Sequence, residues 1–350
     1  MTHHILVIGA NGFVGSHLVQ QALSMGWNVD GVKRKNSNIT HFEAIEKYYR
    51  GKSSIESELI ENLKSELSEF ADSNLAYKQN SHANRGDFKW IELDLQDPVS
   101  LVETLNTPYS FVFNAAAMIS FKSSEDDFMI KTNIEIAKNI VNACLEANCR
   151  NLVHFSSIAA LGRPENDEEI NINTTWTDSD FNTPYALSKY LSEMEVWRGA
   201  QEGLNVLIVN PGVILGYSSG KTSSTQVIDA ANSKNPFVPT GSNGFIFVED
   251  LAHRTLNLLD NSENWNCRHL MVSHNIPFMR LFEIINNVYQ TKRKKILLKQ
   301  PLWSVIYFLV RMLEFFKLHL PISTHLLKST RKNSVYNNKI GATRSRCLVV

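Results

Sequence analysis

Residues 5–15 read ILVIGANGFVG, a short apolar run that passes directly into three glycines at three-residue intervals. A helical pattern of apolar positions follows. In such a strand–turn–helix unit, the first glycine allows a tight turn, the second lets a phosphate approach the backbone, and the third lets helix and strand pack closely. The N–H groups at the helix start attract an anion. We therefore predict a dinucleotide site formed by Gly9, Asn11, Gly12, Phe13, Val14 and Gly15.

Strand and helix patterns alternate over the first two thirds of the chain. Short β-branched or aromatic runs predict strands at residues 5–8, 29–32, 88–92, 111–114, 152–155 and 206–209. Helical spacing predicts helices between them, most clearly at residues 14–25, 126–147 and 185–202. Strands separated by helices form βαβ units, which build a parallel sheet covered by helices on both faces. The predicted fold is α/β, a doubly wound parallel Rossmann sheet with a smaller, mostly helical C-terminal substrate cap.

Two regions interrupt this alternation and define the expected domains. We expect a dinucleotide-binding domain over residues 1–215, with a polar helical insertion at about 40–85. A substrate-binding cap is expected over residues 216–340, apart from a segment at about 246–274 that returns to the Rossmann domain. Residues 341–350 receive no assignment. The insertion is rich in Glu, Ser and Asn, so we interpret it as a surface helical excursion, with a lid or partner-binding element as the alternative.

The composition excludes some classes of partner. The chain has 35 Lys and Arg against 35 Asp and Glu, so no net charge recruits nucleic acid. Its four cysteines show no metal-binding spacing, and we predict no metal site. Cys144 and Cys149 are expected on one helix, too far apart along its axis for a disulfide. Free thiols are typical of a cytoplasmic protein, and we expect that location and a small-molecule substrate.

The most hydrophobic stretch, residues 302–316, does not predict a membrane span. Arg311 and Glu314 interrupt it, and it is shorter than the roughly 20 apolar residues that a bilayer requires. A basic cluster at residues 292–295 precedes it, so contact with a membrane surface is left open but not favoured. The favoured interpretation of the basic cluster is a solvated helix end. A homodimer is also left open.

A Tyr-x-x-x-Lys pattern carries the predicted chemistry. Tyr185 and Lys189 open an expected helix after Pro184, and residues four apart share one helix face. A free tyrosine has a pKa of about 10, roughly three units too high for proton exchange near neutrality. A cation at about 4 Å contributes energy of the required size, about 4 kcal/mol. We therefore expect Lys189 to lower the pKa of Tyr185.

Two further observations concern hydroxyl groups. The Tyr-x-x-x-Lys pattern also occurs at Tyr48 and Lys52, but Gly51 separates them and no sheet strand leads into them, so we interpret that copy as coincidence. Ser156 and Ser157 follow the fifth predicted strand and should lie at the carboxyl edge of the sheet. A hydroxyl there can hold a substrate oxygen, although an isolated serine pair is more often a simple turn.

Four segments together resemble the extended short-chain dehydrogenase/reductases: VHFSS at 153–157, YALSK at 185–189, NPGVILG at 210–216 and FVEDLA at 247–252. The likeness covers most of residues 3–290 except the insertion. It is strongest to dihydroflavonol reductase-like and hydroxysteroid dehydrogenase-like members of the NAD-dependent epimerase/dehydratase family. The resemblance implies a nicotinamide cofactor and three catalytic residues: Ser157, Tyr185 and Lys189.

The resemblance also implies cofactor contacts at further matching positions: Asp94, Leu95, Ala115, Ala116, Ala117, Asn133, Ser156, Tyr185, Lys189, Pro211 and Val213. Arg34 follows the second predicted strand, where related reductases carry a basic residue for the 2′-phosphate of NADP. NAD-specific sites commonly have an Asp or Glu at that strand end, and Asp30 lies too early. We therefore expect NADP, with NAD as the alternative.

Three functions follow from these expectations. The first is an NAD(P)-dependent oxidoreductase that transfers a hydride between nicotinamide and a carbonyl or secondary alcohol of a partly apolar small molecule. The second is a nucleotide-sugar epimerase or dehydratase on the same scaffold. The third is a non-catalytic dinucleotide-binding protein, which the intact catalytic residues disfavour. Cap aromatics suggest an apolar pocket and so favour the first, although core packing explains them at least as well: Phe237, Phe245, Trp303, Phe308 and Phe315.

Overall fold

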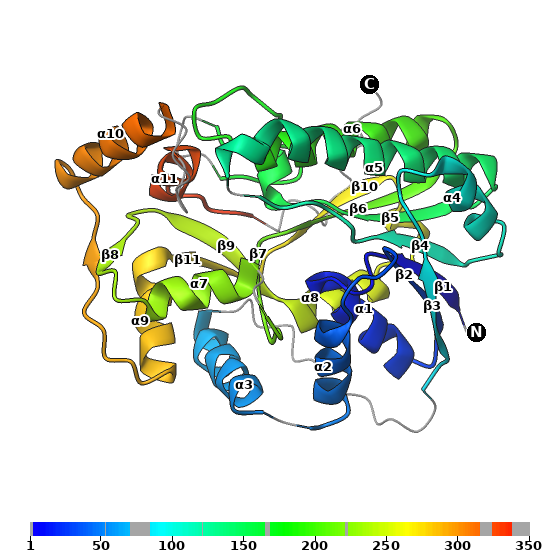
Figure 1. The fold of residues 1–350 in the computed structure, drawn as a ribbon, viewed down its shortest axis with the longest axis horizontal. Helices are drawn as coiled ribbons and strands as arrows, with labels where there is room; N and C mark the ends of the chain where they lie inside the picture. The colour runs from blue at the N-terminus through cyan, green and yellow to red at the C-terminus, as the bar shows by residue number, and fades with distance from the viewer. Residues whose placement is uncertain are drawn as a thin grey trace.

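The computed structural model describes residues 3–52, 54–70, 85–120, 122–164, 169–220, 223–315 and 324–337. Its larger part is a layered α/β unit, and its smaller part lies beyond the carboxyl ends of the central strands (Figure 1). The unassigned residues 341–350 lie outside the described part of the chain.

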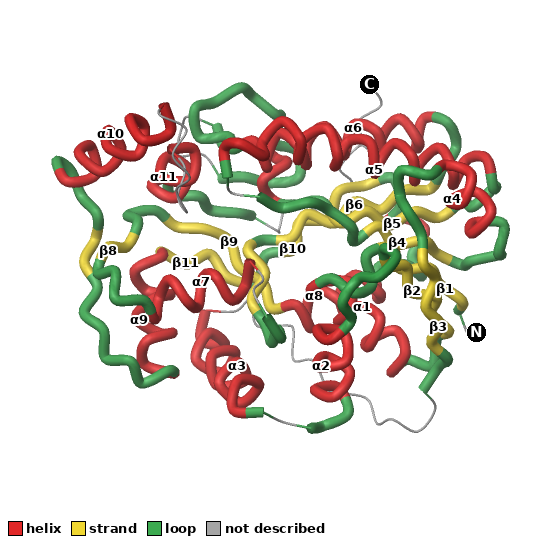
Figure 2. The backbone as a smooth tube through the Cα atoms, in the orientation of Figure 1, coloured by secondary structure: helices red, strands yellow, loops and turns green. Residues whose placement is uncertain are grey.

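A parallel sheet of seven described strands forms the centre of the larger part (Figure 2). The strand order is β10-β6-β5-β4-β1-β2-β3, which confirms the predicted doubly wound topology. The order reverses beside β1, so a ligand is expected at the carboxyl ends of β1 and β4. The strands are β1 (His4–Ile8), β2 (Asn28–Lys33), β3 (Phe88–Glu92), β4 (Phe111–Asn114), β5 (Asn151–Phe155), β6 (Asn205–Pro211) and β10 (Cys267–Met271).

Helices cover both faces of the sheet because its central strands are apolar on both faces. From β1, Leu6 and Ile8 pack toward one helical layer, whereas Ile5 and Val7 pack toward the other. The first layer consists of α4 (Pro98–Leu105), α5 (Asp126–Glu146) and α6 (Pro184–Gln201). The second consists of α1 (Phe13–Ser24) and α8 (Val248–Asn257), which pack against each other. Figure 1 shows the two layers above and below the sheet.

The end of α5 corrects the expectation that two cysteines share one helix. The helix ends at Glu146, and Asn148 adopts a left-handed backbone conformation with φ of 54°. The chain therefore folds back, and the backbone N–H of Cys149 donates a 2.9 Å hydrogen bond to the carbonyl of Cys144. The two thiols are hydrogen-bonded rather than far apart, and both are free.

The described helices of the insertion lie at the surface, each with one face packed on the rest of the fold. α2 (Thr40–Tyr49) packs against α1, and α3 (Ile55–Leu67) packs against α9 (Phe278–Val288) of the cap. α3 buries a narrow apolar stripe in a cluster shared with the cap: Ile60, Leu63 and Leu67. Polar residues surround this stripe, so the composition conceals a helix that has one buried face. Residues 71–84 lie outside the described part of the chain.

The smaller part contains sheets as well as helices. Expected to be mostly helical, it has two small sheets, with strand orders β11-β9-β7 and β12-β8, in the described residues. Phe245 is fully buried in its core, whereas Phe308 is 63% exposed, so these two aromatics do not line one pocket. The remaining elements are β7 (Val213–Leu215), β8 (Phe237–Val238), β9 (Ser242–Phe247), β11 (His274–Pro277), β12 (Ile296–Leu297), α7 (Ser223–Asn232), α10 (Leu302–Phe315) and α11 (Thr324–Arg331).

The hydrophobic stretch near the end of the sequence forms α10. In the part of the chain that the structure describes, neither this helix nor any other has the length and apolar character needed to cross a bilayer. α10 lies at the end of the molecule farthest from the N-terminal strand (Figure 1).

Candidate active site

The start of α6 positions two of the predicted catalytic residues. Thr183 caps the helix, because its hydroxyl accepts a 3.1 Å hydrogen bond from the backbone N–H of Ala186. Pro184 occupies the first turn, where its missing N–H would have no helical partner. Tyr185 and Lys189 then lie about one turn apart on the same side of the helix. The sequence prediction of this helix start is thus close to the observed one.

Ser157, the remaining predicted catalytic residue, is hydrogen-bonded to Tyr185. Ser157 follows β5, and its hydroxyl accepts a 3.1 Å hydrogen bond from the backbone N–H of Ala159. Burial raises the pKa of Tyr185 to about 12, and a hydrogen bond with Ser157 partly offsets this rise. The structure therefore does not show the expected lowering of the Tyr185 pKa by Lys189, because burial dominates the surroundings of the phenol.

Lys189 is held by the sheet. Lys189 is 5% exposed. Its Nζ donates a 2.9 Å hydrogen bond to the carbonyl of Phe155, the last residue of β5. Burial lowers the pKa of Lys189 to about 8, and the negative charge of Glu193 opposes that lowering. The ammonium is therefore the main form at neutral pH, and its remaining protons are available to a ligand in the crevice.

A buried carboxylate behind Lys189 was missed by the sequence analysis. Glu193 is fully buried one turn farther along α6. Its oxygens accept hydrogen bonds from Ser156 Oγ at 2.5 Å, Asn210 Nδ2 at 2.6 Å and Arg268 Nε at 2.7 Å. These donors offset the cost of burying the charge. Ser156, predicted to contact the cofactor, thus directs its hydroxyl to Glu193, and we now assign that side chain a supporting role.

The glycine loop fits a pyrophosphate. Gly9 has a φ of +82°, and a Cβ there would lie 2.9 Å from the backbone nitrogen of Ala116, so only glycine suits the position. A Cβ on Gly15 would collide with the carbonyl of Gly9. α1 begins at Phe13 without a side-chain cap and without an acidic residue in its first turn. The positive end of the helix dipole therefore faces the crevice without an internal anion.

The turn after β4 supports this loop. The backbone N–H of Ala116 donates a 3.2 Å hydrogen bond to the Asn114 side chain, whose Nδ2 contacts Nδ1 of His154 at 3.1 Å. Burial lowers the pKa of His154 to about 3, so its imidazole is neutral. Ala115, Ala116 and Ala117 are therefore placed by a buried polar pair that the sequence analysis missed. The sequence signal for this pair is a polar residue near the end of each of two neighbouring strands, Asn114 in β4 and His154 in β5.

The end of β2 bears on cofactor choice. Arg34 is the exposed residue directly after this strand, where it was predicted. Asp30 is engaged elsewhere, because it accepts a 2.7 Å hydrogen bond from the hydroxyl of Tyr109 and lies 3.3 Å from Nε2 of His4. The last residue of β2 is Lys33. The strand therefore has no carboxylate at its end to bind the ribose hydroxyls.

The other predicted cofactor residues fall into two groups. Asp94 and Leu95 follow β3, and Pro211 and Val213 flank the turn from β6 to β7, so all four lie near the carboxyl edge of the sheet. Their contacts with the cofactor remain predictions. The second group is Asn133, whose side chain is hydrogen-bonded within the protein.

Asn133 of α5 joins the β4–α5 loop to α6. It is 4% exposed, and its Oδ1 accepts a 2.7 Å hydrogen bond from the backbone N–H of Met118. Its Nδ2 donates to the carbonyl of Met118 at 3.0 Å and to Ser188 Oγ at 3.1 Å. Asn133 therefore fixes α6 against the β4–α5 loop, and its predicted contact with the cofactor stays a prediction.

The second Tyr-x-x-x-Lys copy has a structural role. Tyr48 lies in α2, and its hydroxyl donates a 2.5 Å hydrogen bond to Glu61 of α3. α2 ends at Tyr49, so Lys52 lies beyond the helix that carries Tyr48. Burial raises the pKa of Tyr48. The pair therefore has none of the geometry of Tyr185 and Lys189.

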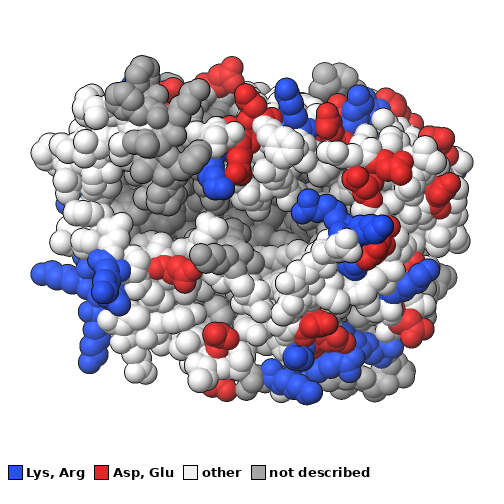
Figure 3. Space-filling view, in the orientation of Figure 1, with Lys and Arg blue, Asp and Glu red and all other residues white. Residues whose placement is uncertain are grey.

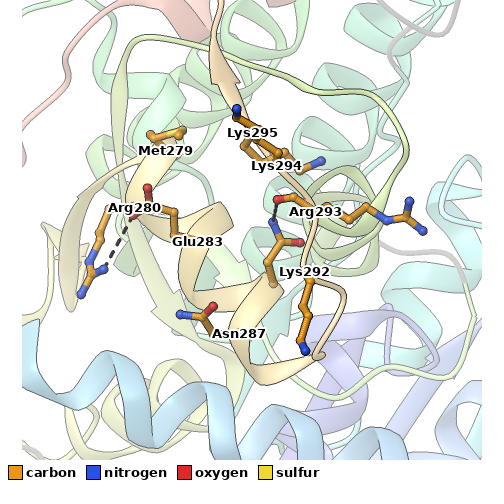
Figure 4. Close-up of a pocket in the computed structure, with 9 residues that line it drawn as sticks. Met279, Arg280, Glu283, Asn287, Lys292, Arg293, Lys294 and Lys295 are labelled. Atoms are coloured by element: carbon orange, nitrogen blue, oxygen red, sulfur yellow. Dashed lines mark hydrogen bonds and ion pairs between the residues drawn. The ribbon is translucent and has the colours of Figure 1, made fainter.

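Two hollows are visible on the molecule. Figure 3 shows one face hollowed across its middle, between the layer of α5 and α6 and the cap and insertion helices. A separate hollow of about 430 Å³ lies between α9 and residues 292–295 (Figure 4). None of its lining residues belongs to the predicted site. The described residues contain no cluster of His, Cys, Asp and Glu suited to a metal ion.

Comparison with known proteins identifies the family. Residues 5–272 match the NAD dependent epimerase/dehydratase family, and the chain belongs to it. Cinnamoyl-CoA reductase 1 of Petunia hybrida is 26% identical over 258 residues, which are 71% of this chain and 66% of that protein. The match thus spans just under two thirds of the length of that relative.

Solved structures share the fold. Gre2 of Candida albicans, crystallised with NADPH, has a TM-score of 0.65 at 16% identity and covers 96% of this chain and 91% of its own. UDP-glucose 4-epimerase of Thermotoga maritima, crystallised with UDP-glucose, has a TM-score of 0.64 at 15% identity, with coverages of 97% and 91%. At these identities the likeness establishes the Rossmann architecture and no particular reaction.

Proposed function

We propose that this protein is an NADP-dependent oxidoreductase that transfers a hydride between nicotinamide and a carbonyl or secondary alcohol of a small, partly apolar molecule. The observation that carries the proposal is the Tyr185 hydroxyl, which is hydrogen-bonded to Ser157 and lies one helical turn from the buried Lys189. Nicotinamide supplies the carbon that gives or takes the hydride. Family membership and the similarity to a cinnamoyl-CoA reductase support the same assignment.

The residues of the chain would manage the proton and the substrate oxygen. During reduction, Tyr185 gives its proton to the carbonyl oxygen, while Ser157 donates a hydrogen bond to the same oxygen. The pKa of about 12 keeps Tyr185 protonated at neutral pH, which suits the reductive direction. The phenolate that results is stabilised by the Lys189 ammonium, and Glu193 keeps that ammonium charged.

The preference for NADP is also part of this proposal. The guanidinium of Arg34 can bind a 2′-phosphate with paired hydrogen bonds, and Asp30 is occupied by Tyr109 and His4. The glycine loop and the start of α1 would hold the pyrophosphate. We further propose a cytoplasmic location, in keeping with the free thiols, and leave a homodimer as a prediction for sedimentation analysis.

Substrate panels test the proposal. Carbonyl compounds of increasing apolar size are incubated with NADPH and with NADH, and nucleotide sugars with each oxidised cofactor, with cofactor absorbance and products both measured. Net NADPH oxidation with an alcohol product is expected. Conversion of a nucleotide sugar without net change in the cofactor would instead assign the alternative, an epimerase or dehydratase. Cofactor binding without any turnover would make the protein a dinucleotide-binding protein.

A further inference from the structure

α10 presents an apolar face to solvent. Five of its large apolar side chains are between 41% and 63% exposed: Leu302, Val305, Phe308, Leu309 and Met312. Their spacing of three and four residues places them on one side of the helix. A contiguous exposed stripe of this kind differs from scattered surface apolar residues, which need no explanation.

The opposite side of α10 packs on α11, which leaves the stripe facing solvent. Trp303 and Tyr307 stack with ring centroids 4.9 Å apart. The guanidinium of Arg331 lies 4.6 Å from the centroid of the Trp303 ring, and Nζ of Lys328 lies 5.7 Å from that of Tyr307. Glu314 accepts hydrogen bonds of 2.9 Å and 2.8 Å from Thr324. The exposed orientation is therefore built into the packing.

The sequence around this apolar face carries positive charge and no negative charge. Residues 284–313 contain no acidic residue and six basic ones, in a chain whose basic and acidic residues balance as a whole: Lys292, Arg293, Lys294, Lys295, Lys299 and Arg311. Figure 3 shows Lys and Arg side chains projecting at the same end of the molecule as α10. This segment is thus locally cationic beside an apolar helix.

The basic side chains do not converge on one bound ion. Lys295 is buried, and its Nζ donates to three backbone carbonyls, which anchors the loop. Lys292, Arg293 and Lys294 are exposed, and their side chains point in different directions from the hollow between this loop and α9 (Figure 4). Divergent cations suit a diffuse negative surface better than a single phosphate.

We infer that α10 and residues 292–299 dock this protein on an anionic lipid surface, with the apolar stripe in the interface and the basic loop against the headgroups. An amphipathic helix lies in the interface plane through its apolar face, and nearby Lys and Arg side chains strengthen its binding to acidic lipid. A second copy of the chain is a poorer occupant, because isologous pairing would bring like charges together.

Vesicle sedimentation of the full chain tests the inference. Vesicles of phosphatidylcholine alone are compared with vesicles that also contain phosphatidylglycerol, at low and high salt. Binding to the acidic vesicles is expected, at least about tenfold tighter than to the neutral ones and weakened by salt. Lys292→Glu with Lys294→Glu should weaken it at least about tenfold. Lys131→Glu with Lys138→Glu, exposed on α5, is the matched control and should change it little.

The apolar stripe has its own pair of variants. Val305→Ser with Phe308→Ser should weaken binding at least about tenfold. Ile55→Ser with Val99→Ser removes two even more exposed apolar groups, from α3 and α4, and should leave binding nearly unchanged. Thermal melting shows that each variant is folded. The inference is overturned by absence of binding, by equal binding to both vesicles, by equal losses in variants and controls, or by a dimer that Val305→Ser with Phe308→Ser abolishes.

Discussion

The hydroxyl of Ser156 donates a 2.5 Å hydrogen bond to the carboxylate of Glu193, and both residues are buried. This bond ties the end of β5 to the third turn of α6. Because Lys189 also donates to the carbonyl of Phe155, the strand end and the helix are joined twice within one turn. The Lys189 ammonium is therefore positioned by the sheet, and the negative charge of Glu193 on α6 favours its charged form.

The phenol of Tyr185 is expected to carry the proton transfer. Tyr185→Phe should leave NADPH affinity nearly intact and reduce turnover by about a hundredfold or more, because only the acid–base group is lost. Stopped-flow turnover and cofactor titration measure the two effects. Tyr48→Phe is the control: it should keep turnover and lose about 1 kcal/mol of stability with its hydrogen bond to Glu61. Equal losses of turnover in both variants would contradict the assignment.

Glu193 is expected to act as a positioning residue through Lys189. Glu193→Gln removes the negative charge that opposes the lowering of the Lys189 pKa, so that pKa should fall below about 8. If turnover requires the ammonium, the alkaline limb of kcat/KM should move to lower pH. A purely structural role would lower activity without moving the limb. Glu195→Gln, on the same helix and paired with Arg198, should leave the profile unchanged.

Arg34 is expected to select NADP. Arg34→Ala should weaken NADPH binding and leave NADH binding nearly unchanged, since only the 2′-phosphate contact is removed. The dissociation constants of NADPH and NADH, measured for the unaltered protein and for the variant, test this prediction. Lys35→Ala, the next exposed cation, is the control. Tighter binding of NADH than of NADPH by the unaltered protein would refute the preference.

Glu249 is expected to make stability depend on pH. It is buried at the start of α8, and in the described structure neither carboxylate oxygen has a hydrogen-bond partner. Burial raises its pKa to about 7; Lys64 opposes this rise, whereas Glu61 and Asp250 add to it. His17 lies 3.9 Å away, and burial lowers its pKa to about 3, so it stays neutral. The folded state therefore binds the Glu249 proton more tightly than the unfolded state, and stability falls as pH rises from about 4.5 through 7.

Glu249→Gln should remove this penalty. Its effect on the free energy of unfolding should be more favourable at pH 8 than at pH 4.5, by about 3 kcal/mol, the equivalent of the shift from 4.5 to about 7. Urea unfolding at several pH values measures the difference. Glu43→Gln, at an exposed position in the first turn of α2, should show no such difference. An identical effect at both pH values would argue against a raised pKa.

The insertion is expected to contribute to global stability. Leu63 is fully buried, so Leu63→Ala should cost about 2–5 kcal/mol through lost burial and a residual cavity. Ile55→Ala, on the same helix but 79% exposed, should change stability by less than about 0.5 kcal/mol. Equal effects in the two variants would mean that α3 is not docked in solution.

Six of the seven described strands of the central sheet, and the helix that carries Tyr185 and Lys189, were predictable because their signals are local. An apolar run bounded by glycines at residues 5–15 determines strand, turn and helix within eleven residues, and β1 and α1 follow it closely. β3 and β4 match their predicted bounds, 88–92 and 111–114. The resemblance added the roles of Tyr185 and Lys189, which geometry alone would not assign.

The remaining features depend on residues distant in the chain. The donors to Glu193 come from β6, β10 and the end of β5, so no window of sequence contains them together. The pKa of Tyr185 depends on how all the surrounding residues exclude water from the phenol, which a pairwise argument about one cation omits. The docking of α3 was hidden because its partner surface is α9, more than two hundred residues later.

The insertion also has a mechanical consequence. α2 packs on α1 of the sheet domain, and α3 packs on α9 of the cap, with Lys64 paired at 3.0 Å to Asp250 of α8. The two helices therefore connect the sheet domain to the cap. A cap braced in this way has little freedom for rigid-body closure. Adaptation to substrates of different shape should then come from side-chain rotamers and loops, and large domain rotations should be absent from the catalytic cycle.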